Sequence, residues 1–267
     1  MSQIETLFSF VREIRSPDMV TNAVFTPVSL SDLQNYKQIE IIIGKQAAVV
    51  CYPDEGNVFR IFFYAADLFE ALKEVTTLLP SVSGKFSFVC DCIGKDLNLK
   101  KMRMAMEKVG FQFYARFQRM ICKELPTVST LDLSQVELAK RDDISEICNM
   151  LYSEFDPITA HFPSEKEMEK FIEHEEIFVI RDGRGIAGFT VFDSYEKKVA
   201  YLAYVITRSQ YRKQYIARKI FLTKTLLHNR NCKYYYLWVN KDSQTAIINH
   251  EKNLFFKDET FNDIYTI

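Results

Sequence analysis

Apolar residues recur with two different spacings along the chain, and these spacings outline the predicted elements. Helical spacing predicts helices over residues 4–14, 68–79, 99–109, 144–152, 165–174 and 216–227. Short runs rich in β-branched and aromatic residues predict strands over residues 39–43, 47–52, 58–64, 86–92, 111–121, 136–139, 177–180, 186–192 and 199–207. The pattern therefore predicts a mixed α+β protein.

Capping residues mark several of the predicted helix ends. Asp67 precedes the helix over residues 68–79, and Asp142 or Asp143 precedes the helix that ends near residue 152. Ser164 and Glu167 have the spacing of a capping box, and Gly110 follows the helix over residues 99–109. These signals place the helix boundaries independently of the apolar pattern.

The two halves of the chain repeat one order of elements. Residues 124–135, ELPTVSTLDLSQ, have the proline and hydroxyl residues of a connection, so we predict domains over residues 1–125 and 133–267. The sequences MEKVGF and HEKNLF occupy equivalent places near the two ends, which favours a diverged internal duplication. A single mixed domain remains the alternative.

Residues 199–227 predict a strand, a basic turn and a helix without a break. The first N–H groups of a helix lack partners and lie at the positive end of its dipole, which makes such a turn an anion site. Arg208, Arg212 and Lys213 add positive charge there. We therefore expect an anionic group to bind this turn.

The charge distribution supports that expectation. The chain has 34 basic and 35 acidic residues, yet residues 197–241 contain no Asp or Glu. Eleven basic residues fall in this segment: Lys197, Lys198, Arg208, Arg212, Lys213, Arg218, Lys219, Lys224, Arg230, Lys233 and Lys241. An anionic ligand is one explanation, and a solvated helix face is the other.

Composition narrows the class of protein. An apolar content of 48% is ample for packed cores, and no apolar run approaches the roughly 20 residues that cross a bilayer. The six cysteines show no zinc-ligand spacing with the four histidines, so we predict no metal site. Residues 1–16 lack the pattern of a secretory signal, and we expect a cytoplasmic protein without a membrane partner.

The turn and the C-terminal segment resemble the GNAT superfamily of acetyl-CoA-dependent N-acetyltransferases. In YRKQYIA, Arg212 and Ala217 match the family pattern RxxGx(G/A), and Tyr215 stands where the family has glycine. In LWVNKDSQTAIINHEKNLFF, five residues match the family's last strand and helix: Val239, Ala246, Ile247, Lys252 and Phe255. In the same segment Ser243, His250 and Leu254 replace asparagine, tyrosine and glycine.

The resemblance implies two GNAT-like folds in tandem, each a mostly antiparallel sheet flanked by helices. It also implies a bound acetyl-CoA, with its pyrophosphate on the turn and its thioester beside a splayed strand. The implied cofactor-binding residues are Val205, Ile206, Thr207, Arg212, Lys213, Gln214, Tyr215, Ile216, Ala217 and Ser243. The implied reaction is attack of a primary amine on the acetyl group, with the amine carried by a small molecule or a peptide.

Catalytic candidates follow from position in this resemblance. His250 takes the place of the tyrosine that protonates the departing thiolate, and an unperturbed imidazole with a pKa near 6.5 suits such a proton transfer. Glu154 or Tyr201 is the candidate base, with Asp156 and Tyr204 as alternatives. Each candidate also has a purely structural explanation. His250 can be a surface histidine, Glu154 and Asp156 can lie in a solvated loop, and Tyr201 and Tyr204 can pack in the core.

The N-terminal half lacks the anion turn. Between its third strand and the following helix the chain passes through Ala65, Ala66 and Asp67, with no glycine and no basic residue. Asp67 would repel a phosphate at the helix N-terminus. The resemblance there is carried by the order of elements and by MEKVGFQF, so we predict a degenerate first copy.

Two other functions stay open. The departures at Tyr215, Ser243, His250 and Leu254 permit a protein that binds or acts as a scaffold without catalysis. A larger acyl or aminoacyl donor would instead bring RNA to the basic segment. The tyrosines Tyr234, Tyr235 and Tyr236 alternate across a predicted strand, and the rest of the chain is acidic, which argues against general nucleic-acid binding. The sequence does not predict the oligomeric state.

Overall fold

A computed structural model describes residues 1–80, 86–194, 198–228 and 231–267. The chain divides into two compact units. Unit 1 comprises Met1–Arg116, Pro157–Phe162 and Thr260–Ile267, and unit 2 comprises Phe117–Asp156 and Pro163–Glu259. Each unit therefore contains residues from both halves of the sequence.

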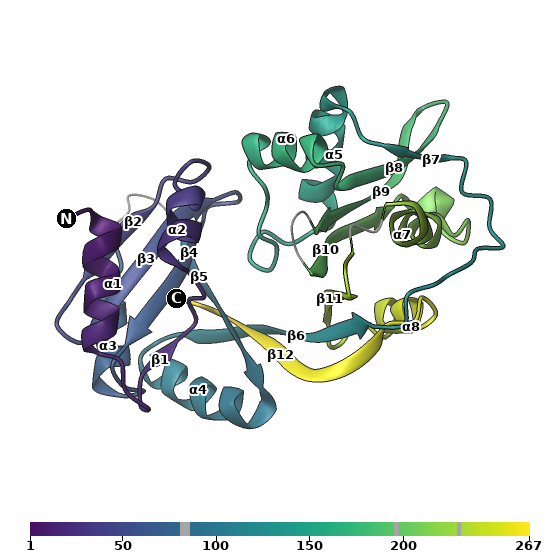
Figure 1. Ribbon diagram of the computed structural model, residues 1–267. Coiled ribbons are helices and arrows are strands. Elements are labelled where there is room, and N and C mark those ends of the chain that lie inside the picture. The colour runs from purple at the N-terminus through teal and green to yellow at the C-terminus, as the bar shows by residue number, and fades with distance from the viewer. Residues whose placement is uncertain (81–85, 195–197, 229–230) are drawn as a thin grey trace. The chain divides into compact units, whose positions relative to one another are not determined.

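Unit 1 is a sheet with helices on both faces (Figure 1). Its elements up to the unit boundary follow in chain order: α1 (Gln3–Glu13), β1 (Val20–Thr21), α2 (Pro27–Leu33), β2 (Glu40–Ile43), β3 (Ala47–Asp54), β4 (Val58–Ala65), α3 (Glu70–Thr77), β5 (Ser87–Lys95), α4 (Asp96–Lys108) and the start of β6 (Gln112–Cys122). The sheet runs in the order β2, β3, β4, β5 and β12.

Strand β3 shows how the sequence builds both faces of this sheet. Ala47, Val49 and Cys51 pack in one buried cluster with α3 and α4. Ala48 and Val50 pack in a second cluster with α1 and α2. Because successive side chains of a strand point to opposite faces, an uninterrupted apolar run is required where both faces are covered.

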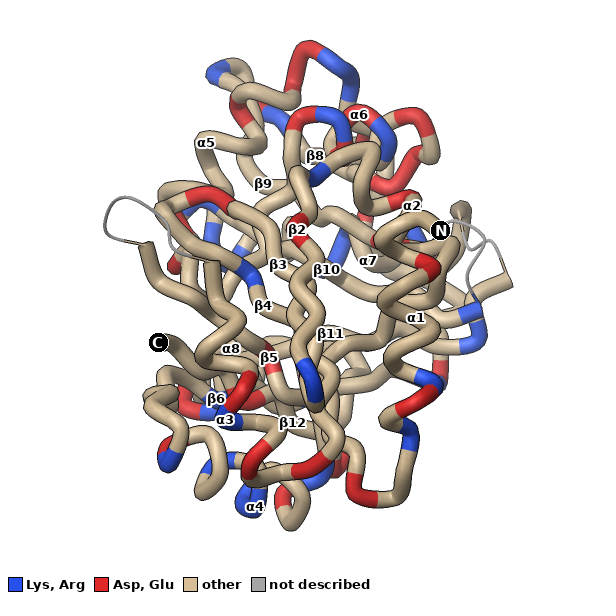
Figure 2. The backbone as a smooth tube through the Cα atoms, turned by 90° about the vertical axis from the view of Figure 1, so that its left-hand side faces the viewer, with Lys and Arg blue, Asp and Glu red and all other residues tan. Residues whose placement is uncertain are grey.

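Unit 2 repeats this plan. Its elements are β7 (Val136–Leu138), the 3-10 turn η1 (Arg141–Asp143), α5 (Ile144–Glu154), α6 (Glu165–Glu173), β8 (Ile177–Asp182), β9 (Gly185–Asp193), β10 (Val199–Thr207), the 3-10 turn η2 (Ser209–Tyr211), α7 (Ile216–Leu227), β11 (Tyr234–Asn240), α8 (Gln244–Glu251) and the start of β12 (Phe256–Thr266). The sheet order is β6, β11, β10, β9, β8 and β7. Lys, Arg, Asp and Glu gather mainly in helices and connections, while the strands are mostly uncharged (Figure 2).

The last strands of the two halves are exchanged. Residues 260–266 of β12 pair antiparallel with residues 89–95 of β5 and thereby complete unit 1. Residues 117–122 of β6 pair antiparallel with residues 235–240 of β11 and complete unit 2. The compact units therefore differ from the predicted ranges 1–125 and 133–267, because each half borrows the closing strand of the other.

Most predicted elements are present, and the differences have local causes. The capping box of Ser164 and Glu167 begins α6, and Gly110 follows α4 with a φ of 103°. Asp143 precedes α5, but its carboxylate accepts from the Lys140 backbone N–H at 2.7 Å and leaves the helix without a side-chain cap. Helix α3 begins at Glu70 rather than directly after Asp67. Elements β1, α2 and β12 were absent from the sequence prediction.

Within the described residues, no helix is long and apolar enough to cross a membrane. The same residues contain no group of three or more His, Cys, Asp or Glu side chains that could hold a metal ion.

Buried charge holds the exchanged strand in unit 1. Asp263 of β12 has no solvent exposure and accepts from Arg116 Nε at 2.5 Å and from Arg116 Nη2 at 2.8 Å. Arg103 Nη2 adds a third contact at 3.2 Å. In unit 2, Asp258 of β12 accepts from Arg119 Nε of β6 at 2.8 Å. Both parts of β12 are thus bound through an Asp to an Arg of β6.

We expect the substitution Asp263→Ala to lower the free energy of unfolding by about 1.5–3 kcal/mol, because it removes charge-assisted hydrogen bonds to Arg116 and Arg103, while Arg116 keeps its pair with Asp96 at 2.6 Å. Urea denaturation followed by circular dichroism measures this change. Glu251→Ala is the control, since Glu251 forms only an exposed pair with Lys257 at 3.8 Å and should cost under about 1 kcal/mol. Equal small losses for both variants would contradict the role assigned to Asp263.

Candidate functional site

Strands β10 and β11 run side by side over only part of their length. They pair in parallel through residues 199–201 and 234–236, whereas β10 stays paired with β9 as far as Thr207. Beyond Tyr201 and Tyr236 no ladder joins the two strands within the described residues. The inner edges of β10 and β11 therefore diverge and leave backbone groups available to a ligand.

The direction of the backbone groups in β10 follows from one hydrogen bond. Arg208 N donates to Ala187 O of β9 at 3.0 Å. Because N–H groups alternate between the two edges of a strand, the N–H of Ile206 also points toward β9. The N–H groups of Val205 and Thr207 then point toward β11. Two of the three predicted backbone donors thus face the opening between the strands.

The turn after β10 has the backbone of a glycine-rich anion site without the glycines. Lys213 has a φ of 75° and Tyr215 a φ of 58°, both in the left-handed region, while Arg212 between η2 and Lys213 has a φ of −57°. Alternating backbone handedness of this kind turns successive N–H groups toward one concave side. The Tyr215 side chain is 59% exposed, so its ring leaves the backbone accessible.

Helix α7 begins directly after this turn. Lys219 N donates to Tyr215 O at 2.8 Å, which is the first bond of the helix ladder. The N–H groups of Ile216, Ala217 and Arg218 precede that bond and are the donors that a helix N-terminus offers to an anion. The Ile216 side chain is buried, and Gln214 N donates to Tyr211 O at 3.2 Å. Gln214 can therefore contribute only its exposed side chain.

The basic residues of the segment 197–241 have different environments. Arg212 and Lys213 are exposed and form no ion pair with another described residue. Arg208 Nη2 instead donates to Glu146 Oε1 at 2.7 Å. Lys224 is fully buried against Glu176 at 3.1 Å. Lys197 and Arg230 lie outside the described residues. The expectation that Arg208 adds free positive charge is therefore wrong, whereas Arg212 and Lys213 retain theirs.

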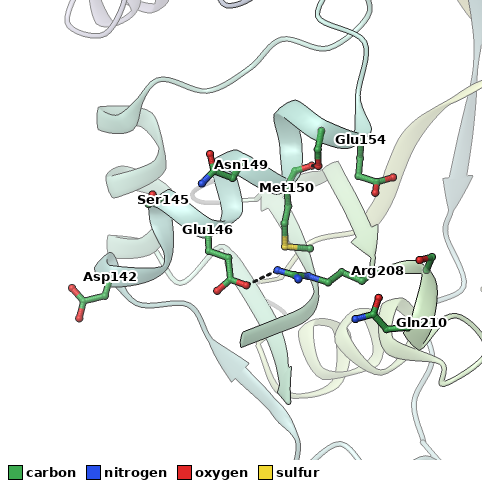
Figure 3. Close-up of a pocket in the computed structure, with 10 residues that line it drawn as sticks. Asp142, Ser145, Glu146, Asn149, Met150, Glu154, Arg208 and Gln210 are labelled. Carbon is green, nitrogen blue, oxygen red and sulfur yellow. Dashed lines mark hydrogen bonds and ion pairs between the residues drawn. The ribbon is translucent and has the colours of Figure 1, made fainter. Parts of the chain in front are cut away.

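A cavity of about 680 Å³ lies between α5 and the start of the turn, as Figure 3 shows. The side chain of Arg208 extends toward Glu146 across it, with the Met150 thioether beside them (Figure 3). The lining residues are Asp142, Ser145, Glu146, Asn149, Met150, Ser153, Glu154, Arg208, Ser209 and Gln210. Three carboxylates against one guanidinium make this lining net acidic.

Glu146 organises the wall of the cavity. Its Oε1 also accepts from Ile186 N at 3.0 Å, so one carboxylate ties α5 to the β8–β9 hairpin and to the end of β10. Gly185 is required there, since its φ is 131° and a Cβ would lie 2.7 Å from Glu146 Oε1. The sequence prediction missed Glu146, because its partners are 40 and 62 positions away.

The predicted catalytic residues are distributed over three elements. Glu154 ends α5 and lines the cavity. Tyr201 lies where β10 and β11 begin to diverge, and its ring stacks on Tyr236 with 5.0 Å between centroids. Tyr204 of the same strand packs against Phe155 at 5.6 Å. Asp156 follows α5 and does not line the cavity. The arrangement brings Glu154, and not Asp156, to the cavity.

His250 lies on α8 and Ser243 directly precedes that helix. Burial lowers the pKa of His250 from its ordinary value near 6.5 to about 4. The imidazole is therefore neutral at neutral pH, and the expectation of an unperturbed pKa is wrong. Ser243 N donates to Asn240 O at 3.0 Å, and the Ser243 side chain makes no capping bond to α8.

Unit 1 has the same diverging strands but a different turn. Strands β4 and β5 pair in parallel only through residues 58–60 and 87–89. At the start of α3, however, Asp67 Oδ1 accepts from Phe69 N at 2.7 Å and from Ala71 N at 3.4 Å. The carboxylate of the chain itself thus occupies the helix N-terminus in unit 1.

Comparisons with known proteins agree with this geometry. The model of the acetyltransferase (GNAT) family matches residues 143–255. No curated protein matches the chain by sequence. The residue range of the family match includes the diverging strands, the turn and α8.

Several solved structures are similar to the whole chain. A tandem GNAT protein from the clavulanic acid biosynthesis pathway shares 9% sequence identity with a TM-score of 0.59, over 99% of this chain and 94% of that one. A GCN5-related N-acetyltransferase from Sphaerobacter thermophilus shares 13% identity with a TM-score of 0.58, over 99% and 91% of the two chains. One from Kribbella flavida shares 10% identity with a TM-score of 0.56, over 89% and 92%.

At these identities the likeness concerns the fold. The protein therefore has the fold of tandem GNAT proteins, and its residues 143–255 match the model of the acetyltransferase (GNAT) family.

Proposed function

We propose that the chain transfers an acetyl group from acetyl-CoA to a primary amine of a small molecule or peptide. The observation that carries this proposal is the turn between β10 and α7, where Lys213 and Tyr215 adopt left-handed backbone without being glycine. Such a conformation costs about 1–2 kcal/mol per L-residue. A cost retained at two positions in one turn is reasonable where the backbone itself binds a ligand.

The turn would bind the cofactor pyrophosphate. The N–H groups of Ile216, Ala217 and Arg218 supply directed donors at the positive end of α7. Arg212 and Lys213 add two exposed cations. The N–H groups of Val205 and Thr207 then supply donors for the pantetheine and for the oxygen of the thioester carbonyl, on which negative charge develops during attack.

Acetyl-CoA supplies an activated acetyl group as its thioester when it is bound. The amine would enter through the cavity beside α5, whose net acidic lining favours a cationic acceptor. Glu154, at the end of α5 in the cavity lining, is the proposed base that removes a proton from that amine. His250 is neutral at neutral pH, so it can donate only a hydrogen bond to the departing thiolate, which takes its proton from solvent.

The double substitution Arg212→Ala with Lys213→Ala is expected to weaken acetyl-CoA binding by about tenfold, since two exposed charge pairs contribute roughly 0.2–1 kcal/mol each. Isothermal titration calorimetry measures the change in Kd. Lys233→Ala is the matched control, because Lys233 is exposed in the same basic segment but follows α7. An equal loss in both variants would point to a general charge effect, and no heat for the unaltered protein at millimolar acetyl-CoA would contradict the proposal.

Substitutions of Tyr215 test the backbone of the turn. Tyr215→Gly should keep or tighten acetyl-CoA binding, because glycine adopts a φ of 58° without strain. Tyr215→Val should weaken both binding and folding by about 1–2 kcal/mol, because a β-branched residue is strained there. Calorimetry and thermal unfolding compare the two variants. Equal affinities for glycine and valine would show that the backbone of Tyr215 does not contact the cofactor.

Glu154→Gln is expected to lower kcat about 10²-fold or more, because the loss of a general base typically has an effect of this size. The Kd for acetyl-CoA should change little. His250→Gln should leave the pH dependence of kcat/KM near neutral pH unchanged, because the His250 pKa of about 4 lies well below that range. Asp142→Asn, also in the cavity lining, is the control for a change of cavity charge. An unchanged kcat in Glu154→Gln would exclude Glu154 as the base.

A further inference from the structure

Four consecutive residues of the turn between β10 and α7 have exposed side chains. These residues are Arg212, Lys213, Gln214 and Tyr215, and none of them belongs to the buried cluster of unit 2. Lys213 and Tyr215 nevertheless adopt left-handed backbone, which is unfavourable for L-residues. A strained conformation persists only where the surrounding structure determines it. The support for this backbone therefore comes from the two ends of the turn.

The far end of the turn is fixed on strand β9. Ile216, the first residue of α7, is 4% exposed and belongs to the buried cluster of unit 2. A Cβ at Gly188 of β9 would lie 2.8 Å from Ile216 Cγ2 and 2.7 Å from Ile206 O. The absence of a side chain at position 188 therefore lets Ile216 approach the strand closely.

The near end of the turn is fixed on strand β8. The ring of Tyr211, the last residue of η2, packs against the same buried cluster. Its hydroxyl donates to Oδ2 of Asp182, the last residue of β8. Its carbonyl oxygen accepts from Gln214 N at 3.2 Å. Tyr211 thus joins the backbone of the turn to a strand that ends 29 positions earlier in the sequence.

The carboxylate of Asp182 is held in place by the hairpin of β8 and β9. Its Oδ1 accepts from Arg184 N at 2.8 Å, so that Oδ2 remains for the Tyr211 hydroxyl. The two strands pair as far as Asp182 and Gly185, where the hairpin closes. The hairpin therefore supplies an oriented carboxylate acceptor to the start of the turn.

We propose that Asp182 is a positioning residue for the cofactor site, because through Tyr211 it holds the turn in the conformation that binds the pyrophosphate. With Tyr211 fixed on β8 and Ile216 on β9, four residues connect two fixed points of one hairpin. Few backbone conformations of so short a span reach both points, so the ordering of the turn is complete before a ligand binds. The role in cofactor binding rests on the proposed function, whereas the fixing of the turn does not.

Two conservative substitutions break this contact and leave the core filled. Tyr211→Phe removes the hydroxyl and keeps the ring, and Asp182→Asn keeps an acceptor oxygen but removes the charge. The Kd for acetyl-CoA, measured by isothermal titration calorimetry, should rise about tenfold in Tyr211→Phe and about threefold in Asp182→Asn, because a hydrogen bond to a charged group contributes more than one to a neutral group. Adding Asp182→Asn to Tyr211→Phe should cause little further loss, since both act through one contact.

Tyr265→Phe is the matched control. Tyr265 OH lies 3.4 Å from Asp263 Oδ2 in unit 1, so this variant removes the same hydroxyl from a buried tyrosine beside an aspartate. Its Kd for acetyl-CoA should equal that of the unaltered protein. An equal rise of Kd in Tyr265→Phe and Tyr211→Phe would overturn the specific role of Asp182.

Nuclear magnetic resonance tests the turn without a ligand. Arg212 N donates to Ser209 O at 3.3 Å, and Gln214 N donates to Tyr211 O at 3.2 Å. Exchange of these two amide hydrogens with solvent should speed up by about tenfold or more in Tyr211→Phe and stay unchanged in Tyr265→Phe.

Steady-state kinetics separate positioning from a loss of folded protein. With an amine acceptor, KM for acetyl-CoA should rise in Tyr211→Phe while kcat changes by less than about twofold, because the contact acts on cofactor binding and not on the reacting atoms. A smaller folded fraction would instead lower kcat at a constant KM, and that result would overturn the positioning role.

The measurements fail in different ways. Unchanged amide exchange in Tyr211→Phe would overturn the fixing of the turn by Asp182, whether or not the chain is an enzyme. Faster exchange with an unchanged Kd would overturn the positioning role. Faster exchange in a chain whose unaltered form does not bind acetyl-CoA would support the fixing of the turn and refute the proposed function, on which the role in cofactor binding depends.

Discussion

The constraint that governs this structure is the need to pair the inner edges of β5 and β11. A strand with an open edge exposes unpaired backbone groups, and a buried edge without a partner is costly. β5 obtains its partner from β12, and β11 obtains its partner from β6. Neither half of the sequence can therefore complete its own sheet. Asp263 and Asp258 secure the exchange, because each joins β12 to an arginine of β6 within one unit.

This exchange explains why a degenerate first copy can persist. Unit 1 keeps the diverging strands of the family plan, but Asp67 satisfies the start of α3 from within the chain. It accepts the last strand of the sequence, and Arg60 receives the carbonyls of Pro157–Phe162. These contacts depend on packing and charge in unit 1.

The sequence predicts those elements that depend on residues close to one another along the chain. Periodicity located β10 and α7, and the resemblance located the turn between them. The left-handed backbone at Lys213 and Tyr215 could not be predicted, because neither residue type favours it. Strand β12 was missed because charged and polar residues interrupt its apolar pattern, and one of them, Asp263, is buried. Its arginine partner Arg116 lies 147 positions away, a separation that no local pattern encodes.

The number of basic residues in a segment likewise does not predict which of them are paired in the fold. The segment over residues 197–241 has eleven basic residues and no acidic one, which suggests a broad cationic surface. In the fold, Glu176 neutralises Lys224 and Glu146 neutralises Arg208, and both carboxylates precede the segment in the sequence. Near the turn, the exposed cations without an ion pair to another described residue are Arg212, Lys213 and Arg218, at the N-terminus of α7. Three cations beside directed N–H groups would suit a compact diphosphate better than an extended polyanion, because a polyanion requires many dispersed contacts.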